Sequence, residues 1–225
     1  MPHHLRRRSL LTGAVATSGA LLLTACSSSS NASSSSGGGD AAAQVAGQGG
    51  AKSPYQGLNL GRTFDKPDVP FTDTSGKPFN IARQTAGKAV LLYFGYTHCP
   101  DVCPTTMGDV AVAVSGLTKA EQAEVQVVFV TTDPARDTPA AMRTWLDSFN
   151  PAFIGLTAPI DTVIAAAKSV GVGVTAPTKG QEPVHGAQVL AYSATDGKAH
   201  IIYTSGTMAP TYQHDLPLLI KGVAV

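Results

Sequence analysis

Two cysteines in this 225-residue chain have the type and spacing that thiol chemistry requires. Cys99 and Cys103 lie four positions apart in the segment YTHCPDVCP, and each is followed by a proline. In helical geometry, residues four apart share one face, and their Cα atoms lie about 6 Å from each other. At that distance two thiols can form a disulfide, exchange disulfides with a partner, or bind a soft metal ion.

A purely structural disulfide is the first alternative, because close cysteines outside the cytoplasm usually form one. Such a bridge would span only the three residues between Cys99 and Cys103. Closing so short a loop removes little conformational entropy from the unfolded chain and therefore adds little stability. Stability alone is thus a poor explanation for the pair, which leaves redox exchange and metal binding.

A metal site needs more donors than these two thiols. Zinc takes four ligands, usually from two separated pairs, and no second Cys or His pair has zinc-finger spacing. Two thiolates and one imidazole instead suit Cu(I). The candidate imidazoles are those of His98, His185, His200 and His214. His185 lies in an expected loop just before a strand, where it can face the dithiol, but spacing alone leaves the choice open.

The dithiol lies where a strand is followed by a helix. Residues 89–94 form a continuous apolar run that is typical of a buried strand. A helix is expected over 104–116, with Pro104 at a position that tolerates a missing N–H. The N-terminus of a helix stabilises a thiolate, which favours both disulfide exchange and metal binding.

The remaining pattern alternates strands with helices. A hairpin is expected over 71–79. Further strands are expected at 124–130, 153–156, 188–192 and 200–204, and further helices at 139–149, 161–170 and 212–221. This order predicts an α/β fold, a thioredoxin-like three-layer domain with an N-terminal hairpin extension.

The N-terminal residues predict export and a membrane anchor. Residues 1–25 have the basic start, apolar run and small-residue end of a signal peptide, and their RRSLL run resembles a twin-arginine signal. The general secretory route is the alternative. The LTAC run resembles the lipobox of bacterial lipoproteins, so Cys26 is expected to carry lipid on the extracytoplasmic face of the cell membrane. Residues 26–53 predict a flexible Ser/Gly/Ala linker, and 54–225 predict the folded domain.

Charge gives little indication of a partner. The chain has 16 Lys and Arg against 15 Asp and Glu, and three of the arginines lie in the expected signal peptide. No basic run with interleaved aromatic residues is present in the sequence, so nucleic acid is not an expected partner.

Three segments together resemble the Sco/SenC family. The YTHCPDVCP segment at 96–104 resembles its CxxxCP motif, and DPARDTP at 133–139 resembles its DPxRDTP segment. His185 falls where that family has a metal-binding histidine before a strand and turn. The three matches occur in the family's order and cover most of residues 64–221.

Two residues near these motifs leave questions open. Val184 departs from the family pattern, in which an acidic residue often precedes the histidine, so the hydrogen-bond partner of His185 is unassigned. Asp133 matches a family position near the site, and a turn residue after a strand is the alternative interpretation.

The resemblance implies copper, as Cu(I) with Cu(II) left open, bound by Cys99, Cys103 and His185. It also implies a role in maturing the copper centre of cytochrome c oxidase, with the copper-bearing subunit or another copper or thiol protein as partner. The first functional hypothesis is a lipid-anchored copper chaperone. The second is an enzyme, a thiol–disulfide oxidoreductase with Cys99 and Cys103 as its catalytic pair. The CxxxC spacing, in place of CxxC, argues against the second.

Overall fold

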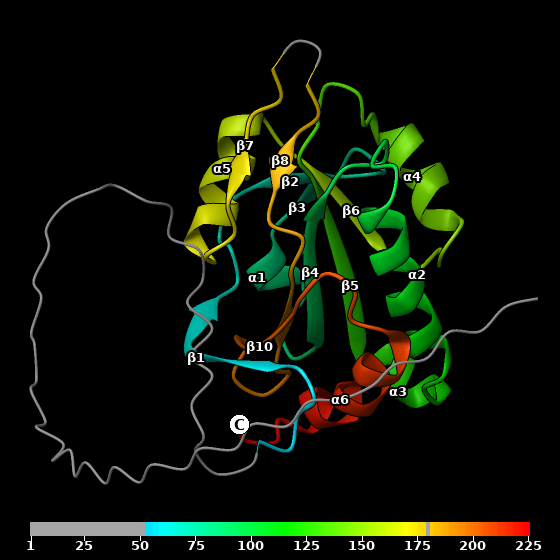
Figure 1. The fold of residues 1–225 in the computed structure, drawn as a ribbon, viewed down its shortest axis with the longest axis vertical. Coiled ribbons are helices and arrows are strands. Elements are labelled where there is room, and N and C mark those ends of the chain that lie inside the picture. The colour runs from blue at the N-terminus through cyan, green and yellow to red at the C-terminus, as the bar shows by residue number, and fades with distance from the viewer. Residues whose placement is uncertain (1–52, 179–180) are drawn as a thin grey trace, which may run out of the picture. The chain divides into compact units, whose positions relative to one another are not determined.

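The computed structural model describes residues 53–178 and 181–225, so the predicted signal peptide, Cys26 and the linker up to residue 52 lie outside the described residues. In the described part, an eight-stranded mixed sheet has helices on both faces (Figure 1). This arrangement confirms the predicted α/β three-layer fold. Among the described residues, no helix has both the length and the apolar character needed to cross a membrane.

The elements follow one another as strands and helices along the described chain. The strands are β1 (Leu58–Asp65), β2 (Phe71–Asp73), β3 (Pro78–Phe79), β4 (Ala89–Gly95), β5 (Val125–Thr131), β6 (Ile154–Thr157), β7 (Val174–Thr175), β8 (Val184–His185), β9 (Val189–Tyr192) and β10 (Lys198–Tyr203). The helices are α1 (Ile81–Gln84), α2 (Val102–Ser115), α3 (Lys119–Ala123), α4 (Pro139–Asp147), α5 (Ile160–Ser169) and α6 (Ala209–Lys221).

The large sheet has the strand order β1-β10-β9-β4-β5-β6-β2-β3. Its centre is parallel, since β4 pairs in parallel with β5 and β5 with β6, whereas β9 runs antiparallel to β4. Every residue of β4 is buried, as expected for a strand that helices cover on both faces. The predicted hairpin, β2 and β3, lies at one edge and pairs with β6.

Alternate residues of β4 face two separate cores. Leu91 and Tyr93 point into the core beneath α2, α4 and α6, whereas Leu92 and Phe94 point into the core beneath α1 and α5. This alternation is the period of a strand, and it explains why the apolar run in the sequence is continuous. The carboxyl end of β4 is therefore held rigidly from both sides.

Several elements differ from the sequence-based expectation. The sequence pattern does not predict five of the elements, β1, α1, α3, β7 and β8. Most of them are short and have little periodicity of their own. The helix after the dithiol begins two residues earlier than expected, at Val102, so Pro104 is its third residue. Because the first turn of a helix leaves its N–H groups without helical partners, a proline is tolerated there.

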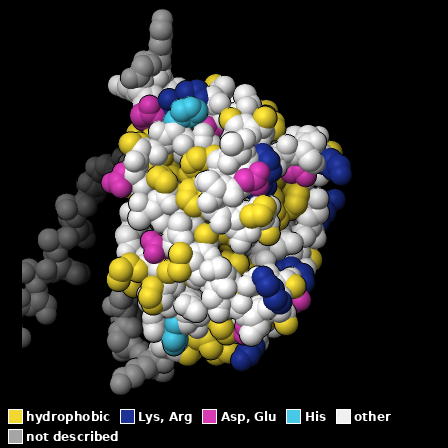
Figure 2. Space-filling view, turned by 90° about the vertical axis from the view of Figure 1, so that its right-hand side faces the viewer, with side chains coloured by type: hydrophobic (Ala, Val, Ile, Leu, Met, Phe, Trp, Pro, Cys, Tyr) yellow, Lys and Arg dark blue, Asp and Glu magenta, His cyan; other side chains and the backbone are white. Residues whose placement is uncertain are grey.

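The outer face of the layer formed by α2, α4 and α6 is mixed in character. Figure 2 shows apolar side chains in separate groups on this face, with charged side chains of both signs scattered between them. Val112 on α2 is one of the large apolar side chains exposed in the described structure.

Candidate copper and thiol site

The junction between β4 and α2 positions both cysteines. Cys103 is fully buried in the first turn of α2, and Cys99 is partly exposed in the loop before it. Gly95, the last residue of β4, makes room for the buried thiol. A Cβ at this position would lie 3.1 Å from the Cys103 Sγ and 2.8 Å from the Tyr93 ring. Glycine is therefore required for this close packing of strand and thiol.

The surroundings of Cys99 favour its thiolate. Partial burial acts to raise the pKa of this thiol, but hydrogen bonds from backbone N–H groups outweigh it and hold the pKa below its ordinary value. One of these donors is the Cys103 N–H, 3.4 Å from the Cys99 Sγ. Cys99 therefore lies against the N-terminus of α2, where the sequence predicted a stabilised thiolate.

Cys103 has the opposite character. Burial raises the pKa of its thiol to about 12. The Tyr93 hydroxyl lies 3.4 Å from its sulfur and donates to it. The two cysteines of one motif thus differ strongly, since Cys99 is the partly exposed thiol with the lowered pKa and Cys103 is the buried thiol with the raised pKa.

His185 lies directly beside the buried thiol. Its Nε2 is 3.7 Å from the Cys103 Sγ, and its Nδ1 is 3.2 Å from the Gly186 carbonyl oxygen. A carbonyl oxygen only accepts hydrogen bonds, so Nδ1 carries the proton and the lone pair of Nε2 faces the sulfur. Burial lowers the pKa of His185, which also favours the neutral ring. The backbone carbonyl is thus the partner that the sequence left unassigned.

Two tyrosines enclose the His185 ring. The ring lies edge-on to Tyr96 at 5.7 Å and edge-on to Tyr93 at 6.1 Å between centroids. Burial, together with the nearby charges of Cys99 and Glu182, raises the pKa of Tyr96 to about 12. Burial also raises the pKa of Tyr93, so both phenols stay neutral beside the thiols. Their rings limit the positions that the imidazole can take.

The other candidate histidines lie elsewhere. The Nδ1 of His98 is 3.3 Å from an oxygen of buried Asp137. His200 pairs with Asp196 within its own hairpin, and His214 contacts the neighbouring Asp215. Of the four candidates, the structure brings His185 into hydrogen-bonding contact with the dithiol.

The segment after β5 contributes residues whose role the sequence left open. Asp133 is in the turn after β5, as the alternative interpretation has it, and its buried carboxylate accepts from the Arg136 side chain in that turn. Arg136 also donates to both carboxylate oxygens of Glu182, at 3.2 and 2.6 Å, and these bonds lower the pKa of Glu182. Asp137 accepts from the backbone and the hydroxyl of Thr97, at 2.9 and 2.6 Å. The DPARDTP match in the sequence indicated this segment but not these contacts.

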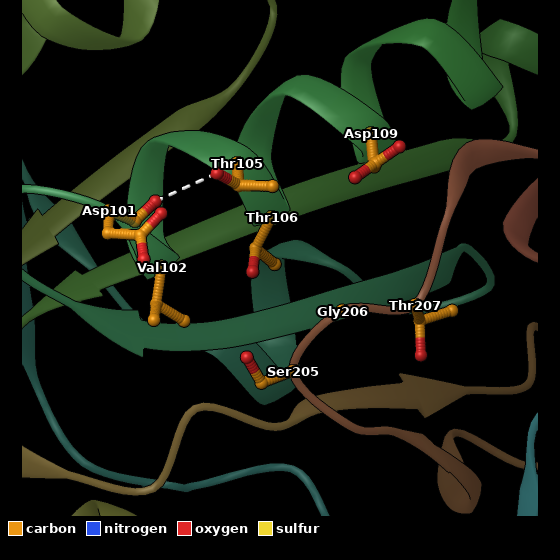
Figure 3. Close-up of a pocket in the computed structure, with 8 residues that line it drawn as sticks. All are labelled: Asp101, Val102, Thr105, Thr106, Asp109, Ser205, Gly206 and Thr207. Carbon is orange, nitrogen blue, oxygen red and sulfur yellow. Dashed lines mark hydrogen bonds between the residues drawn. The ribbon is translucent and has the colours of Figure 1, made fainter. Parts of the chain in front are cut away.

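A cavity of about 200 Å³ opens beside the first turns of α2 (Figure 3). It is lined by α2 and by the loop between β10 and α6, through Asp101, Val102, Thr105, Thr106, Asp109, Ser205, Gly206 and Thr207. Neither cysteine nor His185 lines it. Asp109 accepts from the Ala209 N–H at 2.9 Å and so joins the start of α6 to α2.

The donor set at the dithiol fits a soft metal ion. Within the described residues, no three His, Cys, Asp or Glu side chains stand ready in metal-holding geometry. Cys103 instead contacts each of the other two donors. Its sulfur contacts the His185 Nε2, and its backbone N–H donates to the Cys99 Sγ. Two sulfurs and an imidazole lone pair in an aromatic, largely buried setting are the donors that Cu(I) prefers.

Known proteins of several organisms have sequences similar to this chain. The chain is 37% identical over 127 residues to mitochondrial SCO2 of Saccharomyces cerevisiae, and the match covers 56% of this chain and 40% of that protein. It is 32% identical over 148 residues to a protein of Stutzerimonas stutzeri that is named "Putative copper-binding protein". That match covers 64% of this chain and 72% of the relative.

Solved structures show the same fold. Bradyrhizobium japonicum ScoI with copper bound superposes with a TM-score of 0.58 at 30% identity, covering 66% of this chain and 94% of that chain. BsSco, described as a member of the Sco family of cytochrome c oxidase assembly proteins, gives a TM-score of 0.56 at 18% identity, covering 73% of this chain and 96% of that chain. The sequence profile of the SCO1/SenC family matches residues 60–214, which include the dithiol, the DPARDTP segment and His185. The chain therefore belongs to the SCO1/SenC family.

Proposed function

We propose that this protein binds copper through Cys99, Cys103 and His185 and delivers it during assembly of the copper centre of cytochrome c oxidase. The observation that carries the proposal is the Nε2 lone pair of His185, which faces the Cys103 sulfur at 3.7 Å. The copper bound to the related ScoI supports the choice of metal. Cu(I) suits this donor set because thiolate is a soft ligand.

The unequal thiols define an order of binding. Cys99 is the more accessible of the two thiols and the more easily deprotonated, so it is the first ligand that incoming copper meets. Cys103 must lose its proton before its sulfur can bind, since only the thiolate is a metal ligand. His185 adds its lone pair without losing a proton. Transfer to an acceptor then begins at Cys99, the donor that a second protein can reach.

The proposed setting is the extracytoplasmic face of the cell membrane. The lipobox-like run before Cys26 and the Ser/Gly/Ala-rich linker after it support a lipid anchor that leaves the domain free to reach its acceptor. The copper-bearing subunit of cytochrome c oxidase, or another copper or thiol protein, is the proposed partner.

A Cu(I) titration of the reduced protein against a competing chelator tests the three-donor site. His185→Ala removes one ligand, and we expect the Cu(I) affinity to fall about 100-fold. His200→Ala is the matched control, because that imidazole pairs with Asp196 and not with the dithiol. Equal affinities of wild type and His185→Ala would contradict the proposal.

A thiol–disulfide oxidoreductase is the second candidate, favoured by the contrast between the two thiols. The Cys99 thiolate would attack a partner disulfide, forming a mixed disulfide and releasing one partner thiolate. The Cys103 thiol would lose its proton and attack the Cys99 sulfur, releasing the second partner thiolate. The partner gains two electrons, and Cys99 and Cys103 become a disulfide.

The same variant separates the two candidates. When a thiol reductant is supplied to re-reduce the Cys99–Cys103 disulfide, turnover on a disulfide substrate uses the two cysteines and not the imidazole. His185→Ala should therefore leave turnover largely intact while copper affinity falls. If turnover is absent in the wild-type protein, the oxidoreductase candidate is wrong.

A further inference from the structure

Arg136 connects three parts of the site that lie far apart in the sequence. Its guanidinium donates to buried Asp133 within its own loop and, through two nitrogens, to Glu182 in the loop that leads to His185. Its Cζ also lies 5.9 Å from the centre of the Tyr96 ring, the same ring that packs against His185. The Arg136 guanidinium thus contacts both the loop that leads to His185, through Glu182, and the ring that packs against the imidazole, through Tyr96.

Arg136 is itself held in place. The Asp133 carbonyl oxygen accepts from the Arg136 N–H at 3.1 Å, and the Asp133 carboxylate accepts from the guanidinium. Asp133 is buried at the carboxyl end of β5, next to the rigid centre of the sheet. Because a planar guanidinium presents its donors in a fixed fork, this anchoring directs the remaining donors towards Glu182.

The His185 strand has few other attachments. β8 has two residues, and among the strands of the described residues it pairs only with β7, which also has two. The Gly186 N–H donates to the Gly173 carbonyl oxygen at 2.8 Å, and Val184 is 68% exposed. A strand this short is not stable by itself, so contacts outside the ladder must determine where His185 lies.

We propose that the Arg136–Glu182 ion pair is a clamp that positions His185 against Cys103 and thereby slows copper release. Arg136 and Glu182 are positioning residues in this role, since neither contacts the thiols. The inference rests on the proposed copper function. Glu182 acts through the two residues that separate it from His185, and Arg136 acts through both Glu182 and Tyr96.

The test measures the rate at which Cu(I) passes from the purified reduced protein to excess chelator. Glu182→Gln keeps the shape of the side chain but removes its charge, and we expect release to become about threefold faster. Arg136→Lys keeps the charge beside Asp133 but loses the fork, and it should also speed release. Glu124→Gln is the matched control. Glu124 lies just before β5 and pairs with Lys88, which lies just before β4, and this ion pair is away from the dithiol.

A double-mutant cycle with His185→Ala distinguishes positioning from a general loss of structure. If the clamp acts through His185, then Glu182→Gln should change nothing further once that imidazole is gone. An equal acceleration in both backgrounds, or none in either, overturns the clamp. If His185→Ala itself does not change copper binding, the three-donor site is wrong and the clamp falls with it.

A measurement on the copper-free protein gives an independent readout. Hydrogen exchange of the Gly186 amide reports the attachment of the His185 strand, because this N–H bonds to Gly173. Glu182→Gln should speed this exchange several-fold, whereas Glu124→Gln should leave it unchanged. Raised salt should speed exchange in the wild type and have less effect on Glu182→Gln, since a partly exposed ion pair is screened. Unchanged Gly186 exchange in Glu182→Gln overturns the clamp.

Discussion

At the scale of single residues, the site depends on the contrast between two cysteines of one motif. Cys99 lies against backbone N–H groups and keeps a pKa below its ordinary value, whereas burial raises the pKa of Cys103 to about 12. A partly exposed thiol that ionises more readily, beside a buried thiol that ionises less readily, serves both copper capture and disulfide exchange. The neutral His185 ring adds a lone pair without adding charge.

This contrast predicts selective alkylation of the reduced, copper-free protein. With iodoacetamide at pH 7, Cys99 should react at least tenfold faster than Cys103, because Cys99 holds the larger thiolate fraction and is the more exposed. As pH rises, the Cys99 rate should level off above its lowered pKa, whereas Cys103 should stay largely protonated until about pH 12. Mass spectrometry of the peptides measures both rates. Equal labelling at pH 7 would show that the thiols are not differentiated.

At the scale of elements, the loops after β4 and β5 are joined by one buried carboxylate. Asp137 accepts from the Thr97 N–H and hydroxyl and from the Thr131 hydroxyl, at 2.9, 2.6 and 2.6 Å. These bonds attach the segment before Cys99 to the end of the neighbouring parallel strand. The loop that presents the thiolate is thus positioned by a segment about forty residues away in sequence.

Asp137→Asn should therefore destabilise the domain. The amide retains one oxygen acceptor but turns an NH2 group towards donors, which leaves buried groups unpaired, and we expect a loss of about 1–3 kcal/mol in the free energy of unfolding. Urea denaturation measures it. Asp65→Asn, at a side chain that is 83% exposed, should change stability by less than about 0.5 kcal/mol. Similar losses in the two variants would contradict this role of Asp137.

At the scale of the whole domain, polar contacts attach the segments on either side of β1 to α6 and to the end of α1. Asp215 on α6 accepts from the N–H groups of Gln56 and Gly57, at 2.9 and 2.8 Å. Lys66, after β1, is buried, donates to the Thr85 carbonyl oxygen at 2.9 Å, and lies 5.9 Å from the centre of the Tyr192 ring. Burial lowers the pKa of Lys66 to about 8.

The lowered pKa of Lys66 predicts a pH-dependent stability. Between pH 8 and the ordinary value near 10.5, the unfolded chain binds more protons than the folded one, so folding becomes more favourable as pH rises. Relative to Lys66→Met, the wild type should gain on the order of 2–3 kcal/mol between pH 7 and pH 10.5. Denaturation series at several pH values measure this. Lys119→Met controls for the loss of one lysine charge, and parallel curves for wild type and Lys66→Met would contradict the prediction.

The sequence by itself determined the features that depend on local patterns. The continuous apolar run of β4, the Pro104 near the start of α2 and the turn at 75–76 predicted the strand, the helix and the hairpin that the structure contains. Each follows from the period or the backbone preference of a few neighbouring residues. The export signal, the lipid on Cys26 and the linker stay predictions.

Only the tertiary structure decided which residues meet at the dithiol. Spacing could not choose among four histidines, and the resemblance that favoured His185 did not show its backbone partner. His185 meets Cys103 across 82 residues, Arg136 meets Glu182 across 46, and Asp137 meets Thr97 across 40. Contacts at such separations depend on how strands are ordered in a sheet and where their connecting loops end. The chemistry of the cysteines was therefore visible in the sequence, whereas their surroundings arise from packing that no local pattern encodes.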